Sequence, residues 1–68
     1  MTGMNENALA ILHYVDGYID RFGFSPSYRE IADELGLAVA TVHYHVHVLA
    51  ENDFLVVTKG YNRSLRVT

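Results

Sequence analysis

The sequence contains no cysteine, which excludes disulfide bonds, cysteine-based zinc sites and thiol nucleophiles. It also lacks an apolar run of the ~18 residues needed to cross a bilayer, so we expect no association with a membrane. The first residues, MTGMNE, have neither the basic start nor the apolar centre of a signal peptide. We therefore expect a cytoplasmic, nucleoid-associated protein.

Catalytic patterns are missing as well. The sequence offers no serine–histidine–aspartate constellation, no carboxylate pair that can be placed in a cleft and no phosphate-binding glycine loop. A chain of 68 residues also leaves little room for a substrate pocket. We predict that the protein is not an enzyme and that it uses no cofactor, no metal and no small-molecule ligand.

The 68 residues, half of them hydrophobic, predict one compact domain over residues 1–68. A domain this small buries a modest share of its surface, so a homodimer is a possible source of extra stability. The net charge is −3, but the charges are segregated. All eight acidic residues precede position 54, whereas Lys59, Arg63 and Arg66 follow it without any acid. This distribution is typical of a protein that contacts phosphates with one side.

The hydrophobic periodicity predicts a mainly α fold with a small β-hairpin. Apolar residues recur at helical spacing in the first three segments, and they alternate with polar residues near the C-terminus. The first helical stripe includes Ala8, Leu9, Val15 and Phe22. The expected elements are helices at about 6–22, 28–35 and 39–52, followed by a wing at 54–68 with strands at 54–58 and 64–68.

Short-range signals mark the ends of these helices. Asn5 is a suitable N-cap for the first helix, and Gly23 is a suitable left-handed stop. Ser27 and Glu30 have the spacing of a capping box at the start of the second helix. A short helix, a turn at Gly36 and a further helix together predict a helix-turn-helix motif, and the hairpin makes it a winged one.

Gly17 and the start of the third helix lack such an explanation. A glycine in the middle of a helix costs about 1 kcal/mol relative to alanine, and a close helix crossing is one reason to keep it. The third helix begins after Ala38, which cannot act as a side-chain cap.

The predicted partner is double-stranded DNA, with the third helix in the major groove. Free N–H groups at the start of the second helix favour a phosphate there, and the cationic wing favours phosphates along the backbone. No arginine, asparagine or glutamine on the third helix is placed for a bidentate hydrogen-bond contact with a base. The predicted contacts are Ser27, Tyr28 and Arg29 on the second helix, Ala40, Thr41, His43, Tyr44 and His47 on the third, and Lys59, Tyr61, Asn62, Arg63 and Arg66 on the wing.

Two other interpretations remain open. The apolar and aromatic outer face of the third helix also suits a protein-interaction module. The histidines at 43, 45 and 47 suggest a metal or pH sensor, but only His43 and His47 share a face, and two imidazoles make half of a tetrahedral site. Because imidazoles titrate near neutrality, a pH sensor would bind DNA more tightly in mild acid.

Several motifs resemble the DNA-binding domain of the LexA repressor family. Residues 23–32, GFSPSYREIA, are similar to the family pattern G-[YF]-x-P-[ST]-x-x-E-I-A. The LGL of 35–37, the H-V-x-x-L of 45–49 and the RSLRV of 63–67 are similar to further elements of that family. The resemblance implies a winged helix-turn-helix fold, double-stranded DNA as partner and transcriptional repression.

The sequence departs from the family pattern in two ways. After the LGL element the family commonly has S-S-P or R-S-P, whereas Ala38 and Val39 follow here and the turn is one residue shorter. The family's base specificity is therefore not carried over. The family also continues into a self-cleaving peptidase domain that this sequence does not contain, so we expect a stand-alone bacterial, phage or plasmid regulator.

Overall fold

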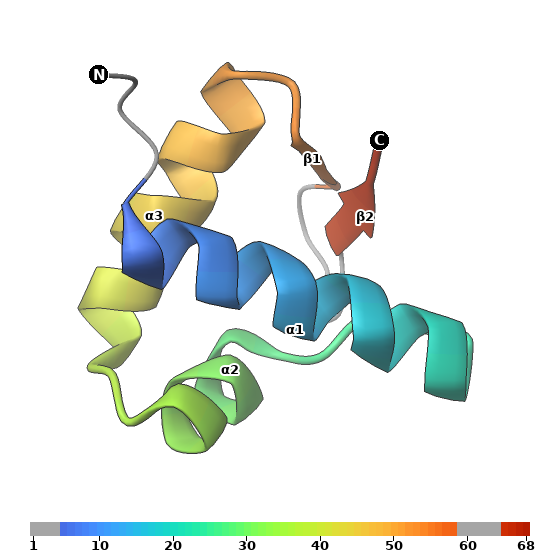
Figure 1. Ribbon diagram of the computed structural model, residues 1–68, viewed down its shortest axis with the longest axis horizontal. Helices are drawn as coiled ribbons and strands as arrows, with labels where there is room; N and C mark the ends of the chain where they lie inside the picture. The colour runs from blue at the N-terminus through green and yellow to red at the C-terminus, as the bar shows by residue number, and fades with distance from the viewer. Residues whose placement is uncertain (1–4, 59–64) are drawn as a thin grey trace.

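The computed structural model describes residues 5–58 and 65–68 of the chain. Figure 1 shows three helices followed by two short antiparallel strands, which confirms the predicted mainly α class with a hairpin. None of the helices within the described residues is long and apolar enough to span a membrane. The elements are α1 (Glu6–Phe22), α2 (Tyr28–Leu35), α3 (Val39–Glu51), β1 (Leu55–Val57) and β2 (Leu65–Val67).

The ends of α1 and α2 are formed by the residues that the sequence predicts. The Asn5 side chain accepts a hydrogen bond from the Ala8 N–H at 2.8 Å. In the capping box, the Glu30 N–H donates to Ser27 Oγ and the Ser27 N–H donates to Glu30 Oε1. Both helices stop at a left-handed glycine, Gly23 with φ 83° and Gly36 with φ 67°. A left-handed backbone costs least at glycine, which explains both stops.

The third helix, α3, ends one residue earlier than predicted. Ala38 precedes it without any side-chain cap, as expected, so its first turn is held by packing. At the other end Asn52 is the C-cap, and its side-chain amide donates to the Val48 carbonyl at 2.8 Å. The next residue, Asp53, has a positive φ of 65°, and the helix cannot continue through it.

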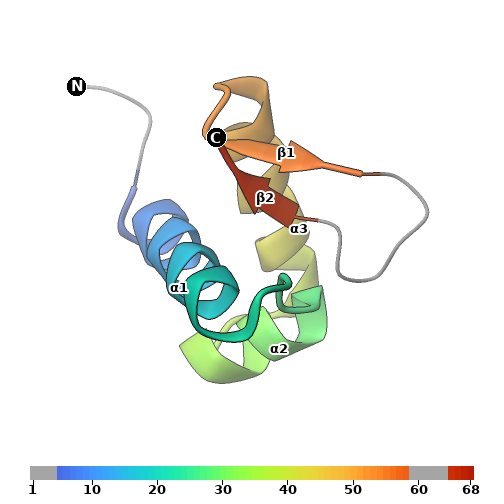
Figure 2. The same ribbon diagram turned by 90° about the vertical axis from the view of Figure 1, so that its right-hand side faces the viewer.

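The hairpin is also shorter than predicted. The Phe54 N–H donates to the Leu49 carbonyl at 2.9 Å, so Phe54 closes α3 and β1 starts at Leu55. The strand then ends at Val57, and β2 ends at Val67. Figure 2 shows the two strands side by side, with Val56 opposite Arg66. Residues alternate along both strands: Leu55 and Leu65 are buried on the inner face, where Val57 is 37 % exposed, and the outer face carries Val56 and Arg66.

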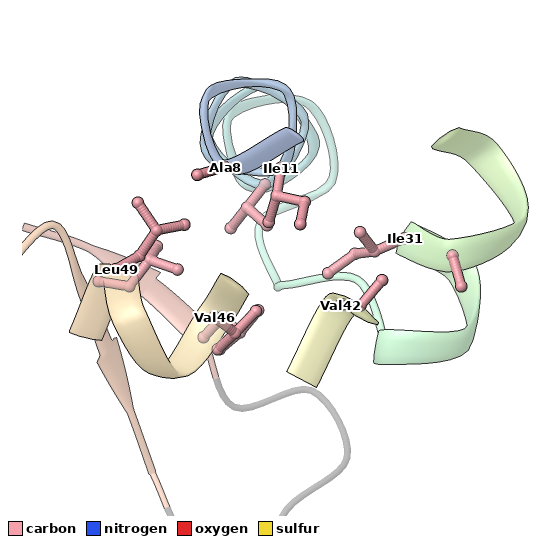
Figure 3. Packing of buried hydrophobic residues seen from close by; sticks show 10 residues of the cluster. Ala8, Ile11, Ile31, Val42, Val46 and Leu49 are labelled. Carbon is pink, nitrogen blue, oxygen red and sulfur yellow. The ribbon is translucent and has the colours of Figure 1, made fainter. Parts of the chain in front are cut away.

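The core lies where the three helices meet the inner face of the hairpin. In Figure 3 the side chains of Ile11, Ile31, Val42 and Leu49 point into this common space from all three helices. Leu55 and Leu65 close it from the hairpin. Burial of these side chains is the main force that holds the short helix α2 in place, because a helix of two turns is unstable alone.

Two members of the predicted apolar stripe of α1 are not part of this core. Leu9 is 42 % exposed and Phe22 is 52 % exposed. Figure 1 shows the reason for Phe22: the last turn of α1 extends beyond α2 and α3, so no helix covers it. Helical periodicity alone cannot reveal where a helix outruns its neighbours.

Gly17 does not mark a close helix crossing, and that interpretation of the sequence was wrong. A Cβ atom built on Gly17 meets no other heavy atom within 4 Å. We therefore expect Gly17→Ala to raise the free energy of unfolding by about 0.5–1 kcal/mol, because alanine reduces the backbone entropy of the unfolded chain. Urea denaturation measures this, and a lower stability than that of the parent chain would contradict it.

Candidate nucleic-acid interface

The start of α2 and the outer face of α3 meet at Tyr28 and His43. Their rings are 4.2 Å apart between centroids and nearly perpendicular, at 81°. Ser27 and Arg29 join them around a hollow of about 280 Å³. The helix-turn-helix therefore brings together four of the residues predicted to contact DNA, three from α2 or its cap and one from α3.

A second hollow links α3 to the hairpin. Its lining includes Tyr28 and His43 again, together with His47, Ala50 and Val57, and its volume is about 270 Å³. Val57 is the last residue of β1, so this hollow reaches the end of the first strand. The start of α2, the outer face of α3 and the end of β1 consequently form one continuous surface, which we call the α3 face.

The outer side of α3 presents small, aromatic and imidazole groups. Ala40, His43, Tyr44 and His47 are exposed, and Tyr44 is the most exposed of the large hydrophobic residues at 63 %. Thr41 is half-buried beside them. These five are the residues predicted to contact DNA from the third helix, and all of them lie at least partly open to solvent on α3.

The neighbouring positions of α3 turn inward. His45 is 6 % exposed and its ring lies 5.2 Å from that of Tyr44. Val48 is half-buried. His45 therefore packs beside Tyr44 on the core side of α3 and does not share the exposed face of His43 and His47.

One carboxylate shares the exposed side of α3. Glu51 lies one helical turn after His47, and its Oε2 is 3.2 Å from His47 Nε2. Both side chains are well exposed to solvent. Glu51 therefore places one negative charge at the C-terminal end of this side of α3.

Burial changes the chemistry of Tyr28. Loss of hydration raises the pKa of its phenol above the ordinary value of 10.0. The hydroxyl therefore stays protonated through the neutral range, so it can donate as well as accept a hydrogen bond.

The predicted wing residues divide into two groups. Lys59, Tyr61, Asn62 and Arg63 lie outside the described residues. Arg66 is described and exposed, but it stands on the outer face of the hairpin opposite Val56. The structure thus separates Arg66 from the two hollows of the α3 face.

Three residues of the α3 face were missed by the sequence analysis. Val46, Ala50 and Val57 line the second hollow, but none of them carries a group that suggests nucleic-acid binding. The alternation of the strand places Val57 on the same side as Leu55, and this is the only signal that could have found it. Among residues 5–58 and 65–68, no group of three or more histidine, aspartate or glutamate side chains is arranged to hold a metal ion.

Three helices with a tight α2–α3 turn and an antiparallel hairpin beside α3 define a winged helix-turn-helix domain. The family model described as the LexA DNA binding domain matches residues 1–64. The chain therefore belongs to the LexA DNA-binding domain family, and it is a DNA-binding domain.

Comparison with individual proteins gives the same family. The chain is 34 % identical over 61 residues to the LexA repressor of Limosilactobacillus reuteri, which covers 88 % of the chain and 29 % of the relative. It is 36 % identical over 66 residues to the LexA repressor of Pediococcus pentosaceus, covering 96 % and 32 %. The LexA repressor of Desulfatibacillum aliphaticivorans is 29 % identical over 68 residues, covering 98 % and 34 %. The chain spans about a third of the length of the relatives it matches.

Proposed function

We propose that the chain binds double-stranded DNA in a sequence-specific manner and regulates transcription, acting as a repressor like the relatives named above. The observation that carries this proposal is the continuous α3 face, which joins the start of α2, the outer side of α3 and the end of β1. No described residue in the linings of its two hollows is acidic. The two hollows therefore offer little repulsion to a polyanion, and Glu51 is the carboxylate beside them at the end of α3.

In this proposal α3 enters the major groove with its N-terminal half. Ala40 and the methyl group of Thr41 pack against base edges, and Tyr44 and His47 exchange hydrogen bonds with bases or phosphates. The N–H groups at the start of α2 and the guanidinium of Arg29 hold a phosphate beside Ser27 and Tyr28. His43 lies between the two helices and serves both contacts.

The wing supplies the sequence-independent part of the affinity. Lys59 and Arg63 neutralise backbone phosphates, Tyr61 and Asn62 add hydrogen bonds there, and Arg66 neutralises a further phosphate from the outer face of the hairpin. Binding of this kind implies that the protein works beside the nucleoid in the cytoplasm. Binding of two copies to two half-sites is part of the proposal, because winged regulators commonly match the symmetry of their sites.

Selection from a pool of random duplexes tests the proposal. The parent chain is expected to enrich a defined motif, and Tyr44→Ala to enrich a less defined one, because Tyr44 reaches from the exposed side of α3. Arg63→Ala is expected to weaken all duplexes alike. If the parent chain enriches no motif and neither variant changes binding, the proposed function is wrong.

A second function is favoured by one observation. Tyr44 exposes 63 % of its surface on a side of α3 that has few charges, which also suits a docking site for another protein. The dependence of affinity on salt separates the two functions and is argued in the Discussion.

A further inference from the structure

A third hollow lies away from the α3 face, between the second half of α1 and the end of α2. Its volume is about 500 Å³, the largest of the three described hollows. Tyr14, Tyr18 and Phe22 line it from α1, and Glu34 lines it from α2. We call it the aromatic hollow, and none of its lining residues belongs to the α3 face.

Three rings of α1 follow one another along this hollow. The ring centroids of Tyr14 and Tyr18 are 5.8 Å apart, and those of Tyr18 and Phe22 are 4.6 Å apart. Phe24 extends the row, at 5.9 Å from Tyr18. Phe22 and Phe24 each expose about half of their surface, so the row is open to solvent at one end. The open ring faces of such a row suit a cation, because the electrons of a ring face attract positive charge.

The chain itself shows that these rings accept a guanidinium. The central carbon of the Arg21 guanidinium lies 5.8 Å from the centroid of the Phe22 ring, within the range of a cation–π contact. Arg21 stands at the same hollow. A second guanidinium or an ammonium group would meet the same chemistry at Tyr14 and Tyr18.

The two helices that form the hollow carry an excess of negative charge. From Glu6 to Leu35, six carboxylates (Glu6, Asp16, Asp20, Glu30, Asp33 and Glu34) outnumber two arginines (Arg21 and Arg29), a balance of −4, and Glu34 is the carboxylate in the lining itself. Glu34 and Glu30 act on Tyr14: its pKa is raised first by burial and then by the charges of Glu34, Tyr18 and Glu30. The hollow therefore attracts cations.

Gly17 keeps the hollow open. It is part of the lining, and the place where a side chain would begin is empty for 4 Å around. Packing within the domain does not explain why a glycine, which lowers the stability of the helix relative to alanine, stands here. Space for a bound ligand side chain explains it.

We propose that the aromatic hollow binds an arginine or lysine side chain of a basic segment in a partner protein, with the cation between the aromatic rings and Glu34. The apolar stem of such a side chain packs along Phe22 and Phe24, and its charged end reaches the carboxylate. The partner binds while the α3 face is occupied by DNA, because the two surfaces share no lining residue. In Figure 1, α2 lies below α1 and the hairpin lies above it, which leaves the partner clear of the wing strands.

A pair of matched peptides tests the proposal. The probes are Ac-GRGRGRG-NH2 and the same peptide with citrulline in place of each arginine, which keeps the shape but removes the charge. Titration of the 68-residue chain is followed by NMR. We expect saturable shifts of the amide signals at 13–22 and 30–34 with the arginine peptide, and shifts at least fivefold smaller with the citrulline peptide.

Variants assign the binding to the hollow. Glu34→Gln and Phe22→Leu are each expected to lower the affinity for the arginine peptide at least threefold. Gly17→Leu is expected to abolish binding, because the leucine side chain fills the hollow. Glu6→Gln is the matched control, because it removes the same charge outside the hollow and is expected to change nothing. Thermal unfolding of each variant shows that the fold is retained, and a saturating DNA duplex is expected to leave the peptide affinity within twofold.

Three results overturn the proposal. One is the absence of saturable shifts with the arginine peptide. Another is an equal effect of Glu6→Gln and Glu34→Gln, which would show attraction by diffuse charge only. The third is displacement of the peptide by DNA, which would place it on the α3 face.

Discussion

Replacement of Leu49 by alanine is expected to lower the free energy of unfolding by about 2–5 kcal/mol. Leu49 is 0 % exposed and lies in the last turn of α3, where its side chain points into the common core (Figure 3). Removal of its branched end leaves a cavity that a domain with one small core cannot fill by rearrangement. A loss of about 3 kcal/mol corresponds to a fall in Tm of about 12–24 °C for a domain of this size.

The magnitude matters because the total stability is small. A chain of this length has a free energy of unfolding of about 3–10 kcal/mol, so Leu49→Ala leaves a part of the population unfolded at moderate temperature. The matched control is Leu9→Ala, the same exchange at a side chain that is 42 % exposed. We expect it to cost less than about 1 kcal/mol, because less apolar surface returns to water. Equal costs in urea denaturation would show that the core is not where the structure places it.

The parts of this fold that the sequence predicts well are those set by neighbours along the chain. Asn5, the Ser27–Glu30 pair and Gly36 act on backbone groups three or four residues away, so their residue types reveal their positions. The end of α3 was predicted less well because it depends on Phe54, whose N–H reaches back to Leu49. Hydrophobic periodicity carries no information about that hydrogen bond.

Features set by contacts between elements could not be predicted. The exposure of Phe22 depends on how far α1 extends past α2 and α3, and the open space at Gly17 depends on how the helices diverge. The same holds for the α3 face. Helical spacing correctly groups Ala40, Tyr44 and His47 on one side, but the contact of His43 with Tyr28 and the approach of Val57 arise only when three elements pack together.

Charge provides a contrast between the two proposed surfaces. The carboxylates concentrate on α1 and α2 around the aromatic hollow, whereas the linings of the α3 face contain no described acid. A net charge of −3 is therefore compatible with binding of a polyanion, since the field near the α3 face is set by local residues. In our proposals the domain has a side for DNA and a side for a basic partner, and substitutions on one side are expected to spare the other.

Affinity for duplex DNA is expected to fall about a hundredfold when the salt concentration rises from about 50 to 200 mM. Four cations are proposed to contact phosphates, namely Arg29, Lys59, Arg63 and Arg66. Each releases about 0.9 of a counterion, so log affinity should fall with log salt at a slope of about −3.6. Fluorescence anisotropy with a labelled duplex measures this slope directly.

Charge-removing variants then show which cations contribute. Arg29→Ala and Arg63→Ala should each reduce the slope by about 0.9, and the double variant should lower it to about −1.8. Arg21→Ala is the matched control. It removes the same charge, but Arg21 lines the aromatic hollow and contacts Phe22, not the α3 face, so the slope should stay unchanged. A slope near zero for the parent chain would favour the protein-docking function of Tyr44, because contacts between apolar surfaces release few counterions. An equal reduction by Arg21→Ala would show that the whole domain, and not one face, attracts the duplex.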